Sequence, residues 1–173
     1  MRQNNQFNHN NMKKIIFQLL IILASVSYTS CEKQEQPDIE GNVPVEASKE
    51  VTEFFNENLP SAFQSVCPDI SVNQACMMVV NDMEELAKIF TSMQLPEIDF
   101  EKYTFVACMF QASAPNYIFR KQAVVEESQK VVLNILMEEI KEGAFPTIYQ
   151  SYYFWGLYDK LPEKPVTANI TVF

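Results

Sequence analysis

The most constraining feature of the chain is an apolar run, Tyr103–Phe110, that follows a short acidic turn beginning at Pro96. Alternate residues of an extended strand face opposite sides. The run therefore presents two apolar faces, formed by Tyr103, Phe105, Ala107 and Met109 and by Val106, Cys108 and Phe110. A strand with no polar face must be covered on both sides. We predict that this strand lies at the centre of the fold.

Two helices are predicted on the N-terminal side of this strand. Apolar residues at helical spacing run from Ser48, a candidate cap, to Leu59, and Pro60 is the predicted stop. Asp82 with Glu85 forms a capping-box-like start for a second helix, whose apolar face extends to Met93.

The remaining apolar and alternating segments predict strands. Their ranges are 76–80, 103–110, 117–125, 130–138, 149–157 and 166–173. We therefore expect a single α+β domain over 48–173, with a largely antiparallel β-sheet of five to six strands and two N-terminal-side helices. The first strand–helix–strand unit could instead place its two strands parallel, through a right-handed crossover.

The N-terminal part of the chain has the layout of an export signal. Met12-Lys13-Lys14 precedes the apolar run Ile15–Ala24, and small and polar residues then lead to Cys31. A basic start, an apolar segment and a small-residue exit are the parts of a secretory signal peptide. The run is shorter than the about 20 residues of a membrane-spanning helix. We predict a signal peptide over 1–30, with Met12 a candidate true start and residues 1–11 upstream of it.

Residues Tyr28-Thr29-Ser30-Cys31 resemble a bacterial lipobox, in which the cysteine is lipidated and becomes the N-terminus. Ser30 fits this pattern, whereas Tyr28 replaces the usual aliphatic residue. The alternative is cleavage near Ser25-Val26-Ser27, which would give a soluble secreted protein. A polar, Pro-containing stretch follows at once and favours lipidation, because an anchored domain needs a tether, predicted here over 31–47. The acyl chains would hold the protein in the cell envelope, expected at the outer membrane and facing the periplasm or the outside.

Charge and composition exclude several classes of function for the predicted mature chain. Loss of residues 1–30 removes Arg2, Lys13 and Lys14 and no acidic residue, so the net charge changes from −9 to −12. An acidic surface repels phosphate backbones, which excludes nucleic acid as a partner. The only histidine, His9, is also lost, so Ser-His-Asp and Cys-His nucleophile systems are absent from the mature sequence.

Other chemistries also lack their residues. The mature glycines, at 41, 143 and 156, stand too far apart for a phosphate-binding loop, and the remaining cysteines have no paired short spacing for zinc. Paired carboxylates such as Glu126/Glu127 and Glu138/Glu139 are formally suited to glycoside hydrolysis, but solvated hairpin ends explain them more simply. We expect no enzymatic activity, no metal and no cofactor.

Three cysteines remain in the predicted mature domain. Cys67 and Cys76 flank a short loop that contains Pro68, in a compartment expected to be oxidising, so a disulfide is predicted between them. Cys108 lies in the central strand and is expected to be a small buried apolar residue. A Cys76–Cys108 disulfide is the alternative, if their strands are neighbours.

The aromatic strand over 149–157 is the candidate binding surface. Its rings could be ordinary core packing. Alternatively, Tyr152 and Phe154 on one face, or Trp155 and Tyr158 towards the end, form a stacking surface for a protein or a glycan. Trp155 is the only tryptophan, a residue type enriched where binding energy concentrates, and Gly156 would leave room for a partner backbone. In the rival interpretation Trp155 lies in the core, on the face shared by Tyr149, Tyr153 and Leu157.

The order of these features resembles one known family. A strand leads to Asn81-Asp82-Met83-Glu84-Glu85-Leu86, then to Leu95-Pro96-Glu97-Ile98-Asp99-Phe100, an apolar strand, a hairpin and a late Tyr-containing strand. This resembles the C-terminal domain of the PrcB-like protease complex subunit family, whose members are often lipoproteins, over residues 76–173. Two positions depart from the family pattern. Ala114-Pro115-Asn116-Tyr117 replaces a Gly-Gly-Tyr-like turn, and Ser151-Tyr152 replaces a Pro-Tyr pair.

The resemblance implies a non-catalytic accessory role in which the protein stabilises or tethers an extracytoplasmic protease, and it carries over no catalytic residues. The leading hypothesis is therefore a lipid-anchored envelope protein that binds another extracytoplasmic protein. The alternative is a lipoprotein that binds a glycan or a small molecule through Tyr152, Phe154, Trp155 and Tyr158.

Overall fold

The structure, a computed structural model, describes residues 37–112, 117–140 and 149–173. The chain divides into two units, Met1–Gln36 and Pro37–Phe173. The predicted signal peptide and Cys31 lie in the first unit, outside the described residues. The described part of the second unit holds two helices and six strands, which confirms the α+β class.

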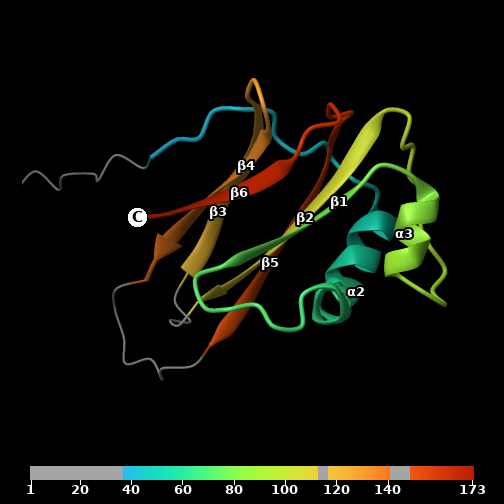
Figure 1. The fold of residues 1–173 in the computed structure, drawn as a ribbon, viewed down its shortest axis with the longest axis horizontal. Helices are drawn as coiled ribbons and strands as arrows, with labels where there is room; N and C mark the ends of the chain where they lie inside the picture. Colours follow the sequence, from blue (N-terminus) through green and yellow to red (C-terminus); the bar gives the residue numbers. More distant parts are fainter. Residues whose placement is uncertain (1–36, 113–116, 141–148) are drawn as a thin grey trace, which may run out of the picture. The chain divides into compact units, whose positions relative to one another are not determined.

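The six strands form two three-stranded sheets. The first sheet has the order β1-β2-β5, with β1 at Ala75–Val80, β2 at Tyr103–Ala112 and β5 at Gln150–Asp159. The second has the order β3-β4-β6, with β3 at Tyr117–Glu126, β4 at Val131–Glu139 and β6 at Val166–Val172. In Figure 1 the first sheet lies between the second sheet and the helices α2 (Lys49–Val66) and α3 (Met83–Ile89).

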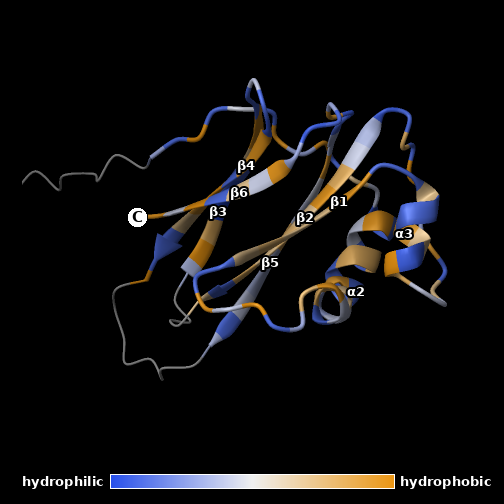
Figure 2. Cartoon of the chain, in the orientation of Figure 1, coloured by the Kyte–Doolittle hydropathy of each residue, from blue (hydrophilic) through white to orange (hydrophobic). Residues whose placement is uncertain are grey.

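The central strand is covered on both faces, as its sequence predicts. Phe105, Ala107 and Met109 of β2 belong to a core shared with the helices, which includes Phe55 of α2 and Leu86 of α3. The other face of β2 belongs to a second core shared with β4. Its residues there are Val106, Cys108 and Phe110, and those of β4 are Val131, Leu133, Ile135 and Met137. In Figure 2, the hydrophobic colour also runs along β1, the neighbour of β2 in the first sheet.

The pairing of the strands is mostly antiparallel, with one exception. β1 is antiparallel to β2, so the parallel crossover considered for this pair is wrong. The short helix α3 and the turn after it return the chain to β2 at the end of β1 that it has just left. β4 and β6 are parallel, and β5 lies between them in the sequence but in the other sheet. The passage of the chain through β5 provides the long connection that two parallel neighbouring strands need.

Both helices begin as predicted but end elsewhere, α2 beyond Pro60 and α3 at Ile89, before the predicted Met93. α2 continues through Pro60 to Val66, because Leu59, Ala62 and Phe63 prolong its buried face and offset the main-chain hydrogen bond that proline cannot donate. Ser48 caps the helix as predicted, with Oγ accepting from the N–H of Val51 at 3.3 Å. Asp82 caps α3 by accepting from the N–H of Glu85 at 2.8 Å.

The segment Asn42–Val45, here called the strap, is held on the domain. Asn42 exchanges two main-chain hydrogen bonds with Val124, at 2.9 and 2.8 Å, and the N–H of Val45 donates to the carbonyl of Leu157 at 2.8 Å. Farther upstream, Asp38 pairs with Lys121. The last part of the segment predicted as a tether, 31–47, is thus hydrogen-bonded to both sheets.

Gly156 explains how closely the strap packs. A Cβ atom at this position would lie 2.7 Å from Cβ of Pro44, which is closer than real Cβ contacts come. The room that Gly156 was expected to leave for a partner backbone is therefore occupied by the strap of the same chain.

The predicted disulfide joins Cys67 at the end of α2 to Cys76 in β1, with 6.5 Å between the Cα atoms. Cys108 is free and buried. In the β1–β2 register, Cys76 lies opposite Met109 and packs in the helix-side core, whereas Cys108 packs in the core between the sheets. The two cysteines therefore face opposite sides of one sheet, which excludes the alternative pairing.

Replacing Cys67 and Cys76 together by serine should lower the free energy of unfolding by about 2–3 kcal/mol, because the closed loop restricts the unfolded chain. Urea denaturation of the wild type and the double variant measures this difference. Mass spectrometry of the unreduced wild type should show the Cys67–Cys76 link and a free Cys108. A Cys76–Cys108 link would contradict the assignment.

Candidate functional site

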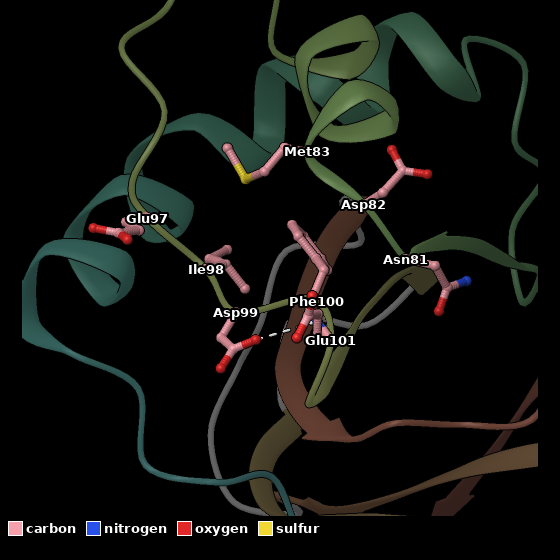
Figure 3. Close-up of a pocket in the computed structure, with 8 residues that line it drawn as sticks. All are labelled: Asn81, Asp82, Met83, Glu97, Ile98, Asp99, Phe100 and Glu101. Atoms are coloured by element: carbon pink, nitrogen blue, oxygen red, sulfur yellow. Dashed lines mark hydrogen bonds between the residues drawn. The ribbon is translucent and has the colours of Figure 1, made fainter.

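One hollow lies where α3 begins, and Figure 3 shows it in close-up. It encloses about 690 Å³ and is lined by Asn81, Asp82, Met83 and the stretch 97–101. In Figure 3 the carboxylates of Asp82, Glu97 and Asp99 point in different directions, away from a centre formed by Met83, Ile98 and Phe100. Among residues 37–112, 117–140 and 149–173, no group of three His, Cys, Asp or Glu side chains could hold a metal ion.

The carboxylate of Asp99 is already engaged. It pairs with Lys102 at 2.7 Å, and this hydrogen bond lowers the pKa of Asp99 and raises the pKa of Lys102. It also accepts from the N–H of Glu101 at 3.2 Å. Asp99 thus serves the turn before β2 and Asp82 caps α3, and the carboxylates of the hollow form no convergent set.

A neighbouring hollow of about 460 Å³ contains a self-contained polar network. Thr104 donates to Oδ1 of Asn81 at 2.8 Å and accepts from the N–H of Leu161 at 3.1 Å. Nζ of Lys160 donates to the carbonyls of Phe100 at 2.8 Å and Asn81 at 3.1 Å. These groups satisfy one another and tie together the ends of β1, β2 and β5.

A third concavity, here called the aromatic groove, lies between the edges of the two sheets. It encloses about 380 Å³ and is lined by Asn56, Phe119, Gln122, Tyr152, Tyr153, Phe154 and Trp155. β5 is an edge strand of the first sheet, and β3, which carries Phe119 and Gln122, is an edge strand of the second. The groove brings together three of the four residues predicted for binding, Tyr152, Phe154 and Trp155.

The alternation of β5 divides these rings between two faces. Phe154 packs between the sheets and is 6% exposed, and its ring lies 5.6 Å from that of Phe119. The ring of Tyr152 lies on the same face, 5.8 Å from that of Tyr117, and its hydroxyl accepts from the N–H of Tyr117 at 3.4 Å. Phe119 itself is 45% exposed and forms the most open apolar part of the groove.

Trp155 faces α2 and is only half-buried. Its ring centroid lies 5.1 Å from that of Phe55 and 6.3 Å from that of Phe105, and Nε1 donates to Oδ1 of Asn56 at 2.9 Å. This placement matches the core interpretation of the sequence, although one side of Trp155 still lines the groove.

Tyr158 is a correction to the predicted binding surface. It is fully buried between the sheets, because the alternation of β5 turns it inward two positions beyond Gly156. Its hydroxyl has no hydrogen-bond partner within the described residues. Burial raises the pKa of Tyr158 well above its ordinary value, and burial also raises the pKa of the Cys108 thiol to about 12. Both groups stay protonated in the core.

Phe119 and Gln122 were missed by the sequence analysis. Gln122 is 9% exposed and donates from Nε2 to the carbonyl of Trp155 at 2.6 Å, which links the two sheets across their open side. The available signal was a polar residue on the inward face of β3, next to Val124 two positions along. Nothing in the sequence distinguished Phe119 from other apolar strand residues. Its exposure depends on the register shift between Phe119 and Lys121, which the sequence does not reveal.

Comparison of the chain with protein-family models, with curated proteins and with solved structures finds no match. Among the described residues, neither helix is both long and apolar enough to span a bilayer. The function of the chain is therefore inferred from its sequence and from the geometry of the aromatic groove.

Trp155→Ala should lower the free energy of unfolding by about 3 kcal/mol, because it removes a large ring from the core beneath α2. Phe119→Ala should change it by less than about 1 kcal/mol, because that ring is largely exposed. Thermal or urea unfolding of the two variants makes the comparison. Equal stability of Trp155→Ala and the wild type would show that the indole adds little to the core.

Proposed function

We propose that this chain is a lipid-anchored, non-catalytic protein of the cell envelope that binds another extracytoplasmic protein through the aromatic groove. The observation that supports this proposal is the groove itself, an open concavity with rings contributed by β3 and β5. Aromatic side chains provide large contact areas at a small entropic cost, so they are enriched where proteins bind one another.

The polar groups of the groove favour a protein partner over a glycan. A sugar presents many hydroxyls and needs several available hydrogen-bonding groups around it. In the groove, Oδ1 of Asn56 already accepts from Trp155, and Nε2 of Gln122 already donates to the Trp155 carbonyl. The lining that remains is mostly apolar, with Phe119 and Phe154 at its centre.

The charges of the domain favour a neutral or basic partner surface. Every lysine and arginine of the described residues is engaged. Seven pair with carboxylates, namely Lys49, Lys88, Lys102, Arg120, Lys121, Lys130 and Lys164. Lys160 binds main-chain carbonyls. Among the described residues, no cation pairs with carboxylates such as Glu50 and Glu57 of α2, so an acidic partner would be repelled.

A protease complex is our proposal for the identity of the partner, and it rests on the sequence resemblance over residues 76–173. The envelope location rests on the signal-peptide and lipobox-like residues that end at Cys31. A domain held at a membrane needs a binding surface more than a catalytic centre to keep a partner there.

Anchoring is tested by metabolic labelling. Labelled palmitate should enter the wild-type protein, and Cys31→Ser should abolish the label and release the protein into the soluble fraction, because the acyl chains attach through this cysteine. Cys108→Ala, whose thiol is buried in the fold, is the matched control and should keep the label. An unlabelled, soluble wild type would contradict lipid anchoring.

Binding through the groove is tested by crosslinking in intact envelopes, with quantitative mass spectrometry of the proteins captured. Phe119→Ala should lose the partner by about tenfold, because it removes the exposed ring of the groove while leaving the fold in place. Met93→Ala, which removes an exposed apolar side chain after α3, is the matched control and should capture as the wild type does.

Two results would count against the proposal. Equal capture by the wild type and both variants would remove the groove as the binding site. Binding of the wild type to envelope oligosaccharides on an array, lost in Phe119→Ala, would establish the glycan alternative instead.

A further inference from the structure

The edges of β5 and β3 lie on the same open side of the paired sheets. The strap is bonded to both, through Asn42 to Val124 of β3 and through Val45 to Leu157 of β5. Next along the same side, Gln122 of β3 donates to the carbonyl of Trp155 in β5. The aromatic groove follows beyond Gln122, towards the start of β5. This edge thus already pairs with one extended segment of the chain itself.

The strap also reveals which main-chain groups of β5 point outward. The carbonyl of Leu157 accepts from Val45, so Leu157 turns its main-chain groups away from β2. In an antiparallel strand this orientation recurs at every second residue. The residues concerned are Trp155, Tyr153 and Ser151. Gln122 occupies the carbonyl of Trp155, whereas the outward groups of Tyr153 and Ser151 have no main-chain partner among the described residues.

Gln122 lines the groove and also has a buried acceptor that no described group satisfies. Its Nε2 donates to a carbonyl, so the amide orientation is determined, because the opposite orientation would set two oxygens against each other. Its Oε1 is buried and accepts no hydrogen bond within the described residues. A buried acceptor without a donor is unfavourable, so the contact between Gln122 and β5 is not fully satisfied within the described residues.

We infer that an extended segment of the partner protein adds as a strand to the Ser151–Tyr153 part of β5. It would lie on the same edge of β5 that the strap contacts at Leu157. This inference rests on the proposed function and specifies the form of its ligand. Alternate side chains of the added strand contact Phe119 and Phe154, and these should be apolar. The intervening side chains face α2, which carries Asn56 and Glu57, and these should be neutral or basic.

The probe is a pool of eight-residue peptides in which Val, Ile or Phe alternates with Lys or Thr. Amide hydrogen exchange of the full chain is measured with and without the pool. Strand addition should slow exchange at Ser151 and Tyr153 at least tenfold, because their N–H groups gain acceptors. The same pool methylated at alternate peptide nitrogens should bind more weakly, and replacing Lys by Glu should weaken binding further.

Ser151→Pro removes an outward N–H that takes no part in the pairing with β2, so the sheet should tolerate it. It should weaken peptide binding by about tenfold or more, whereas the matched control Ser151→Ala should bind within twofold of the wild type. The exchange measurement on the wild type needs no variant, so it decides the question even if Ser151→Pro does not fold.

Strand addition is overturned if the pool leaves exchange at Ser151 and Tyr153 unchanged, or if a folded Ser151→Pro binds as the wild type does. The envelope crosslinking separates this failure from failure of the proposed function. If Phe119→Ala loses the partner and Ser151→Pro captures it fully, the groove remains the binding site and only strand addition is rejected. Full capture by both variants removes the groove itself.

Discussion

The structure depends on the need to cover β2 on two sides. No residue of Val106–Phe110 can face water without exposing apolar surface, so the sheet that contains β2 must be the middle layer. The helices supply one cover, with Phe55 stacked 4.2 Å from Phe105. The second sheet supplies the other through β4, whose Leu133, Ile135 and Met137 are fully buried. The two cores are both apolar and are separated by the β1-β2-β5 sheet alone.

Because the middle layer is a sheet, its edges become the places where the domain can interact. One edge, β1, is linked to α2 by the Cys67–Cys76 disulfide. The other edge, β5, is bonded to the strap at Leu157, and near Tyr153 it has no main-chain partner among the residues that the structure describes. Edge strands with unpaired main-chain groups attract other strands, and most proteins cover them. An edge that the strap covers near one end, and that aromatic rings line farther along, is suited to a selective contact.

The sequence predicted those parts of the fold that periodicity determines. The two faces of β2, all six strands to within a few residues, the Ser48 and Asp82 caps and the Cys67–Cys76 pair follow from local patterns. The division into two sheets did not, because alternating residues of β3 and β4 fit one sheet or two equally well. The continuation of α2 through Pro60 was also missed, since tertiary packing of Phe63 outweighed the local signal.

The candidate site was predictable only in part, because local sequence patterns locate an aromatic strand but not its neighbours in the fold. Aromatic density pointed to β5, but the sequence could not assign its rings to opposite faces with different neighbours. Trp155 is committed to Phe55 and Asn56, and Tyr158 to the core, while the open ring of the groove comes from Phe119 on a different sheet. The groove forms only where the edges of β5 and β3 come together, and no local sequence pattern predicts which edges of two sheets will be neighbours.

The parallel pairing of β4 and β6 has a consequence for the order in which the domain assembles. β3 and β4 form a local hairpin, but β6 follows β5 in the sequence, and β5 pairs with β2 in the other sheet. Contacts between segments so distant in sequence make folding slow. During synthesis from the N-terminus, the edge of β4 that β6 will cover therefore lacks that partner until Val166–Val172 has emerged. Before β6 is added, the uncovered edge of β4 could pair with a strand of a neighbouring chain. Addition of β6 covers this edge and so protects the domain from aggregation.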